Sequence, residues 1–134
     1  MKIRAVTLAM LCAISFGASA QSNDCREAEE AIAEMSVNVA DAYQSADFEK
    51  ARPLLAKANE NSKKGGDGAK GCGCSRVADP LGKADALLKD ALELGGGFSD
   101  VQDRLYAVIG QSEKARRAAE MCWREKAVVP AKKK

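Results

Sequence analysis

Four cysteines, far apart in the sequence, constrain the fold of this chain more than any other feature. They are Cys25, the closely spaced Cys72 and Cys74, and Cys122; the fifth cysteine, Cys12, lies in the N-terminal segment that we predict to be removed on export. An even number of cysteines in an exported chain indicates disulfides. Because bonded cysteines have Cα atoms within about 7 Å of each other, two disulfides would bring these positions together at one end of the fold.

The first 20 residues carry the three regions of a secretory signal peptide. Lys2 and Arg4 supply positive charge, residues 5–16 form an uncharged apolar run, and Ala18-Ser19-Ala20 has the small side chains that a signal peptidase accepts. We predict cleavage after Ala20 and a mature protein in the periplasm or outside the cell. The apolar run is shorter than the roughly 20 residues of a membrane-spanning helix, so we expect no stable membrane anchor.

Charge and residue usage exclude several classes of function. Loss of Lys2 and Arg4 with the signal leaves 19 basic and 19 acidic side chains, so we expect no nucleic-acid partner. The chain contains no histidine, which removes the commonest metal ligand and general base, and also the Cys–His and Ser–His nucleophile pairs. We therefore predict a non-catalytic protein without a cofactor.

Apolar residues recur at intervals of three and four, which is typical of helices with one buried face. One such stripe runs from Cys25 to Ala42, a second starts at Phe48, a third runs from Val77 to Leu94, and a fourth runs from Phe98 to Cys122. The fold class that we predict is all-α: a four-helix up-down bundle, or two antiparallel helical hairpins, tied at one end by two disulfides. We expect the helical domain to cover 21–126 and a disordered basic tail to cover 127–134.

Two connections between these helices are predicted from local sequence. Ser45 or Asp47 can cap a new helix, so a break is expected near 44–47. Without that break, one continuous helix would place Cys25 about 50–60 Å from the glycine-rich segment that holds Cys72 and Cys74, too far for a disulfide. Residues 62–76 are rich in glycine and charge, which favours a loop.

Two segments resemble the helical hairpins of tetratricopeptide-type repeats. Residues 42–51, Ala-Tyr-Gln-Ser-Ala-Asp-Phe-Glu-Lys-Ala, resemble the turn between repeats, and residues 84–94 resemble a second repeat helix. The resemblance covers about a third of the chain. The Trp-Leu-Gly-Tyr pattern of the repeat and its 34-residue period are missing. The resemblance implies antiparallel helix pairs and assigns no binding residue.

The pairing of the cysteines stays open at this stage. Cys25–Cys72 with Cys74–Cys122, and Cys25–Cys74 with Cys72–Cys122, both suit an up-down bundle, whereas a bond between Cys72 and Cys74 would be strained. Structural disulfides are the first interpretation. The alternatives are a soft-metal site for copper or zinc, formed by the four mature cysteines, or a thiol-redox couple at Cys72-Gly73-Cys74.

A binding or protein-interaction role is the leading hypothesis, with another exported or envelope protein as the partner. The candidate interaction surface consists of Arg116, Arg117, Trp123 and Arg124 on the fourth predicted helix. The arginines could bind an anion, and the tryptophan would lie near the glycine-rich segment at the cysteine-tied end.

Overall fold

The computed structural model describes residues 25–94 and 97–132, with side chains as far as residue 125. The predicted signal peptide and the predicted cleavage site after Ala20 lie outside the described residues. Within them the elements are α2 (Arg26–Tyr43), α3 (Phe48–Cys72), the 3₁₀ turn η2 (Ser75–Val77), α4 (Ala78–Glu93) and α5 (Phe98–Lys132). The described part of the chain contains no strand, and none of its helices is long and apolar enough to cross a membrane.

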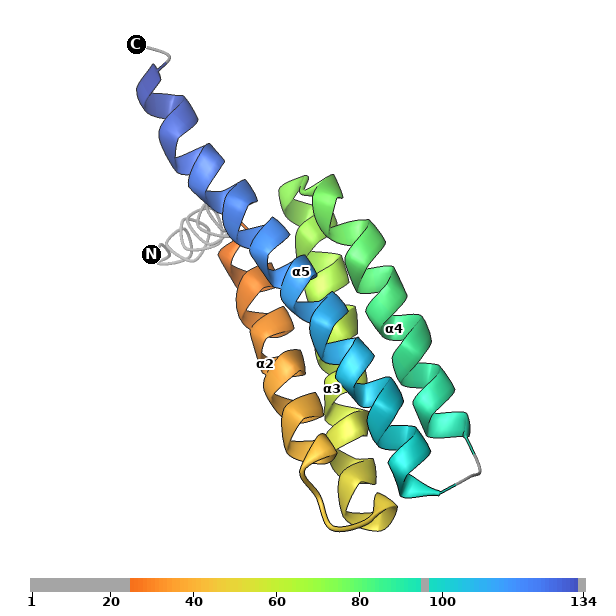
Figure 1. The fold of residues 1–134 in the computed structure, drawn as a ribbon. Coiled ribbons are helices and arrows are strands. Elements are labelled where there is room, and N and C mark those ends of the chain that lie inside the picture. Colours follow the sequence, from red (N-terminus) through yellow and green to blue (C-terminus); the bar gives the residue numbers. More distant parts are fainter. Residues whose placement is uncertain (1–24, 95–96, 133–134) are drawn as a thin grey trace, which may run out of the picture.

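The four helices run antiparallel in up-down order (Figure 1), which confirms the predicted fold class. α2 packs against both α3 and α5, and α4 packs against α5. Their apolar stripes form one core, whose largest fully buried side chains include Ile32, Met35, Leu55, Leu88 and Leu105. Burial of these stripes, with many alanines between them, holds the helices together.

The predicted break between the first two helices is confirmed. α2 ends at Tyr43 and α3 begins at Phe48. Asp47 caps α3, since its carboxylate accepts a hydrogen bond of 2.9 Å from the backbone N–H of Lys50. This bond satisfies one of the free donors at the start of the helix.

The predicted loop at 62–76 is wrong over most of its length, because α3 continues to Cys72. Two of its glycines lie against α2. A Cβ atom at Gly65 would lie 2.6 Å from Ile32 Cγ1, and one at Gly68 would lie 3.3 Å from the Cα and Cβ atoms of Ala28. The glycines therefore let two helix backbones approach closely, and the packing outweighs their low helix propensity.

The C-terminal helix is also longer than predicted. α5 continues to Lys132, past residue 126, where the sequence predicts the start of a disordered tail. Arg124 to Ala127 are good helix formers, so the helix has no local signal to stop at residue 126. Pro130 lies in its last turn.

One side of the bundle is less closed than the others. α3 and α4 are consecutive in the chain and neighbours in space, yet they contact each other much less than the other adjacent helices do. Small residues occupy the facing surfaces, among them Gly66, Ala69, Ala78 and Gly82. The bundle is therefore open between α3 and α4.

Candidate functional site

Two disulfides tie the end of the bundle at which α2 begins and α3 ends. Cys25 bonds Cys72, with Cα atoms 5.5 Å apart, and Cys74 bonds Cys122, with Cα atoms 5.9 Å apart. The first of the two pairings that the sequence allowed is therefore present. We call this region, defined by the four cysteines, the cysteine-tied end.

Gly73 directs the two neighbouring cysteines to different helices. It adopts a left-handed conformation with φ of 77°, which glycine tolerates without steric cost. The backbone N–H of Cys74 then bonds the carbonyl of Ala69 at 2.8 Å, and that of Gly73 bonds the carbonyl of Lys70 at 3.2 Å. This helix-ending motif lets Cys72 bond to the start of α2 and Cys74 bond to α5.

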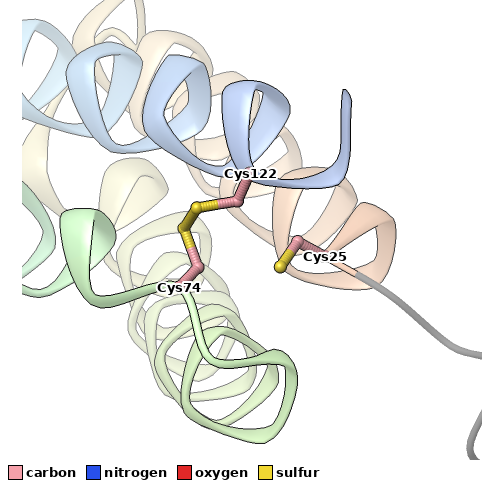
Figure 2. A group of neighbouring side chains, drawn as sticks. All are labelled: Cys25, Cys74 and Cys122. Atoms are coloured by element: carbon pink, nitrogen blue, oxygen red, sulfur yellow. A yellow bond between two sulfur atoms is a disulfide. The ribbon is translucent and has the colours of Figure 1, made fainter. Parts of the chain in front are cut away.

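The two disulfides lie next to each other. The Sγ atoms of Cys25, Cys74 and Cys122 are all within 4.8 Å of one another. Figure 2 shows the sulfur of Cys25 beside the Cys74–Cys122 bond. Cys25 and Cys74 are buried, and Cys122 is partly exposed. Three of the four residues of the metal alternative are therefore close together in space, and the fourth, Cys72, is bonded to one of them.

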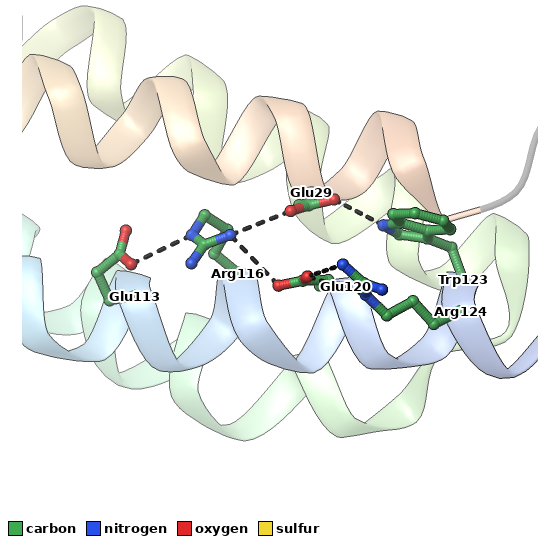
Figure 3. A network of polar contacts seen from close by, with 6 residues as sticks. All are labelled: Glu29, Glu113, Arg116, Glu120, Trp123 and Arg124. Carbon is green, nitrogen blue, oxygen red and sulfur yellow. Dashed lines mark hydrogen bonds and ion pairs between the residues drawn. The ribbon is translucent and has the colours of Figure 1, made fainter.

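A network of charged side chains joins α2 to α5 near this end (Figure 3). The guanidinium of Arg116 lies 3.0 Å from a carboxylate oxygen of Glu29, 3.1 Å from one of Glu113 and 3.6 Å from one of Glu120. The hydrogen bond to Glu113 raises the pKa of Arg116 further, partial burial opposes this, and the negative charges of the three carboxylates add to the increase. Arg116 is therefore charged and already surrounded by acids.

The tryptophan of the predicted surface belongs to the same network. Trp123 donates its indole N–H to Glu29 Oε1 at 2.6 Å. The guanidinium carbons of Arg26 and Arg124 lie 4.7 and 5.2 Å from the centre of a Trp123 ring, within cation–π range. Glu29 therefore joins Arg116 to the indole, and two arginines flank the ring.

The structure thus brings together three of the four residues of the predicted interaction surface. Arg116, Trp123 and Arg124 lie in one network, and Arg124 pairs with Glu120 at 2.7 Å. Arg117 is on the same helix and is exposed. The acids that neutralise these arginines were not identified from the sequence, because Glu29 lies 87 residues from Arg116.

A groove opens between α3 and α4, with a volume of about 730 Å³. It extends from Ser62 and Asp85 to Gly73 and Cys74 at the cysteine-tied end. Glycines and apolar residues make up more than half of its lining: Gly66, Ala69, Gly73, Cys74, Val77, Ala78, Leu81 and Gly82. Sequence reasoning missed this groove because it treated the glycines as a loop. On a helix, the 3 and 4 spacing of Gly66, Ala69 and Gly73 forms a stripe of small residues on one face.

The two rims of the groove differ in charge. Asp85 on α4 accepts a hydrogen bond of 3.4 Å from the Ser62 hydroxyl and pairs with Lys89 at 3.3 Å. On the α3 rim, Lys63 and Lys70 stand with a single acid, Asp67. The α3 rim therefore has a positive balance, whereas the acid on the α4 rim is neutralised within the molecule.

Comparison with protein-family models, curated proteins and solved structures finds no match to this chain. The likeness to tetratricopeptide-type hairpins accordingly stays a prediction. The fold and the site define a class by themselves: an antiparallel four-helix bundle with two adjacent disulfides at one end and an apolar groove along its open side.

Proposed function

We propose that this chain is an exported, non-catalytic binding module that holds another exported or envelope protein in the groove between α3 and α4. The observation that carries the proposal is the groove itself. It has a volume of about 730 Å³ and lies open along the side of the bundle. Its lining of glycines and apolar residues, with a few charged groups at the rim, suits the apolar face of a partner helix.

Bonds at both ends support a groove that exists before any partner arrives. At one end the Cys74–Cys122 disulfide ties the start of α4 to α5. Towards the other end the Ser62 hydroxyl bonds Asp85 across α3 and α4. A preformed site loses less conformational entropy on binding than one that must fold around its partner.

The lining favours the side of a partner helix as the occupant. Gly66, Gly73 and Gly82 present no side chain, and a Cβ atom at Gly73 or Gly82 would meet nothing within 4 Å. Another backbone can therefore approach these positions closely. A helix that lays its apolar face into such a groove is a common mode of protein recognition.

Export is supported by two independent observations. Two disulfides are typical of proteins in oxidising compartments. The N-terminal sequence has the three regions of a secretory signal, with cleavage proposed after Ala20. Mass spectrometry of the protein from fractionated cells tests this: we expect a chain that begins at Gln21 and lacks free thiols. A chain that retains residues 1–20 in the cytoplasmic fraction contradicts it.

A pair of matched variants tests the role of the groove. Gly82→Phe places a bulky ring in the groove, whereas Gly110→Phe places the same ring on an exposed part of α5. A Cβ atom at either glycine meets nothing within 4 Å, so both variants are expected to fold, which circular dichroism checks.

The readout is the set of proteins captured by cross-linking in the periplasm and identified by mass spectrometry. We expect the wild-type chain and Gly110→Phe to capture the same partner, and Gly82→Phe to lose it. Equal capture by all three chains would place the binding surface elsewhere. Absence of any enriched protein with the folded wild-type chain would contradict a binding module.

A further inference from the structure

The sulfur atoms at the cysteine-tied end have an arrangement that the groove does not use. The Sγ atoms of Cys25, Cys74 and Cys122 lie within 4.8 Å of one another, and Cys72 is bonded to Cys25. The Cys72 sulfur lies outside this group of three and is held beside it by its bond of 2.05 Å to Cys25. The four cysteines thus meet at one end of the bundle, although they come from the start of α2, the end of α3, the turn before η2, and α5. We propose that the four cysteines, in their thiol form, bind one soft metal ion such as Zn²⁺ or Cu⁺.

The distances suit a tetrahedral sulfur site. Zinc–thiolate bonds of about 2.3 Å place the sulfurs of a tetrahedral site about 3.8 Å apart. From separations within 4.8 Å, the Cys25 sulfur would need to approach those of Cys74 and Cys122 by at most about 1 Å to reach this spacing. The Cys72 sulfur lies outside this group of three and would need to move further. The two sulfurs of each opened disulfide would separate to the same spacing. Rotation of the cysteine side chains, that of Cys72 above all, would supply these movements.

The surroundings favour the charge of such a site. Four thiolates around Zn²⁺ carry a net charge of −2, which needs compensation when it is buried. Cys25 is the N-cap of α2, where the partial positive charge of the helix end favours an anion. Arg26 and Arg124 are at the same end, flanking Trp123. The site would thus combine burial of Cys25 and Cys74 with nearby positive charge.

The chemistry needs no change of oxidation state at the metal. A chain crosses the membrane with its cysteines as thiols, and disulfides form afterwards by loss of two electrons and two protons per bond to a disulfide oxidant. If a metal ion arrives first, it displaces the four thiol protons and forms four metal–sulfur bonds. Thiolate ligation then competes with disulfide formation. Either outcome ties together the same helix ends, so the metal would replace both disulfides as a cross-link.

Cobalt(II) provides a direct probe of this site. The mature chain is first reduced under nitrogen by a phosphine. The phosphine takes an oxygen atom from water and becomes a phosphine oxide, and the two hydrogens of that water convert each disulfide to two thiols. Cobalt(II) is then added. We expect the visible absorption of tetrahedral cobalt thiolate to saturate at one ion per chain, and Zn²⁺ to bleach it. The thermal midpoint that reduction lowers should rise again when either metal binds.

Single-ligand variants distinguish a built site from four separate thiols. Cys122→Ser should weaken Zn²⁺ binding on the order of 100-fold or more, because it removes one of four ligands. Ser75→Ala, beside the ligands but without a sulfur, should leave binding unchanged. The proposal is overturned by cobalt spectra without thiolate character, by a stoichiometry other than one, or by equal affinity of Cys122→Ser and the wild-type chain. The groove experiment uses the oxidised protein, so either result stands without the other.

Discussion

The substitution Gly65→Ala tests the packing of α3 on α2 directly. A methyl group at this position would lie 2.6 Å from Ile32 Cγ1 and 3.3 Å from Ile32 Cδ1. Non-bonded carbon atoms prefer about 3.5–4.0 Å, so the new methyl would stand about 1 Å too close. Ile32 is fully buried and branched at Cβ, and it cannot turn aside without disturbing the core.

The magnitude follows from two opposing effects. Alanine is a better helix former than glycine by about 0.5–1 kcal/mol. Overpacking a well-filled core costs about 1–3 kcal/mol. Gly71 lies in the same helix and is exposed, and a Cβ atom there meets nothing within 4 Å. Gly71→Ala therefore has the helix effect alone, and the two variants should differ by about 1–3 kcal/mol in the free energy of unfolding.

The measurement is thermal and guanidinium unfolding of both variants, followed by circular dichroism with the disulfides intact. A difference of 1 kcal/mol moves the thermal midpoint of a domain of this size by about 4–8 °C. We expect Gly71→Ala to melt above the wild-type protein and Gly65→Ala below Gly71→Ala by at least about 4 °C.

Equal midpoints for Gly65→Ala and Gly71→Ala would refute the close helix contact, since both positions would then be free of neighbours. A double-mutant cycle adds a second test. With Ile32→Ala in place, the methyl at Gly65 has room, so the penalty of Gly65→Ala should shrink or change sign. An unchanged penalty would show that the cost arises from something other than Ile32.

Three further predictions concern one disulfide and two hydrogen bonds that join different helices. Replacing both Cys74 and Cys122 with serine should lower the free energy of unfolding by about 4 kcal/mol, because the bond closes a loop with a sequence separation of 48. Guanidinium unfolding without reductant measures this loss. A loss below about 1 kcal/mol contradicts the argument from loop entropy. The hydroxyls of Ser36 and Ser112 are 2.7 Å apart and buried. In the same assay, Ser112→Ala should lower the free energy of unfolding by about 1–3 kcal/mol, because it leaves the Ser36 hydroxyl without its partner, and the variant with alanine at both positions should lose less. A larger loss in the double variant would contradict the pairing. Glu29→Ala removes the hydrogen-bond acceptor of Trp123, the only tryptophan in the chain. We expect the free energy of unfolding to fall by about 1 kcal/mol, discounted for partial exposure, and the tryptophan emission to shift. An unchanged emission spectrum would exclude the hydrogen bond in solution.

Local sequence determined most of the helical framework. The 3 and 4 spacing of apolar residues predicts which face of each helix is buried, because that face is the one that can leave water. The break near 44–47 follows from the capping carboxylate of Asp47. The even number of cysteines outside the predicted signal peptide predicts that Cys25 and Cys122 return to the segment at Cys72 and Cys74, and both disulfides are present.

The tertiary structure decided what local propensity could not. Gly65 and Gly68 favour a loop when considered alone, but both lie within α3. They are the residues at which α2 packs so closely that a side chain would meet Ile32 or Ala28. The choice between the two disulfide pairings depends on where each cysteine lies. Cys72 is in the last turn of α3, beside Cys25 at the start of α2, whereas Cys74 follows Gly73 and lies against α5. Glycine loses about 1 kcal/mol of helix stability relative to alanine, and the burial of core side chains such as Ile32 against α3 exceeds that loss.

The candidate site divides in the same way. The cysteines and the arginines of α5 could be selected from the sequence, since the residue type alone tells which side chains can form disulfides or carry a positive charge. The acids that neutralise Arg116 and the groove between α3 and α4 were not, because both depend on which helix faces meet. Residue type and spacing state which groups a helix can present. Only the packing of one helix on another decides which of those groups are paired, covered or left open to a partner.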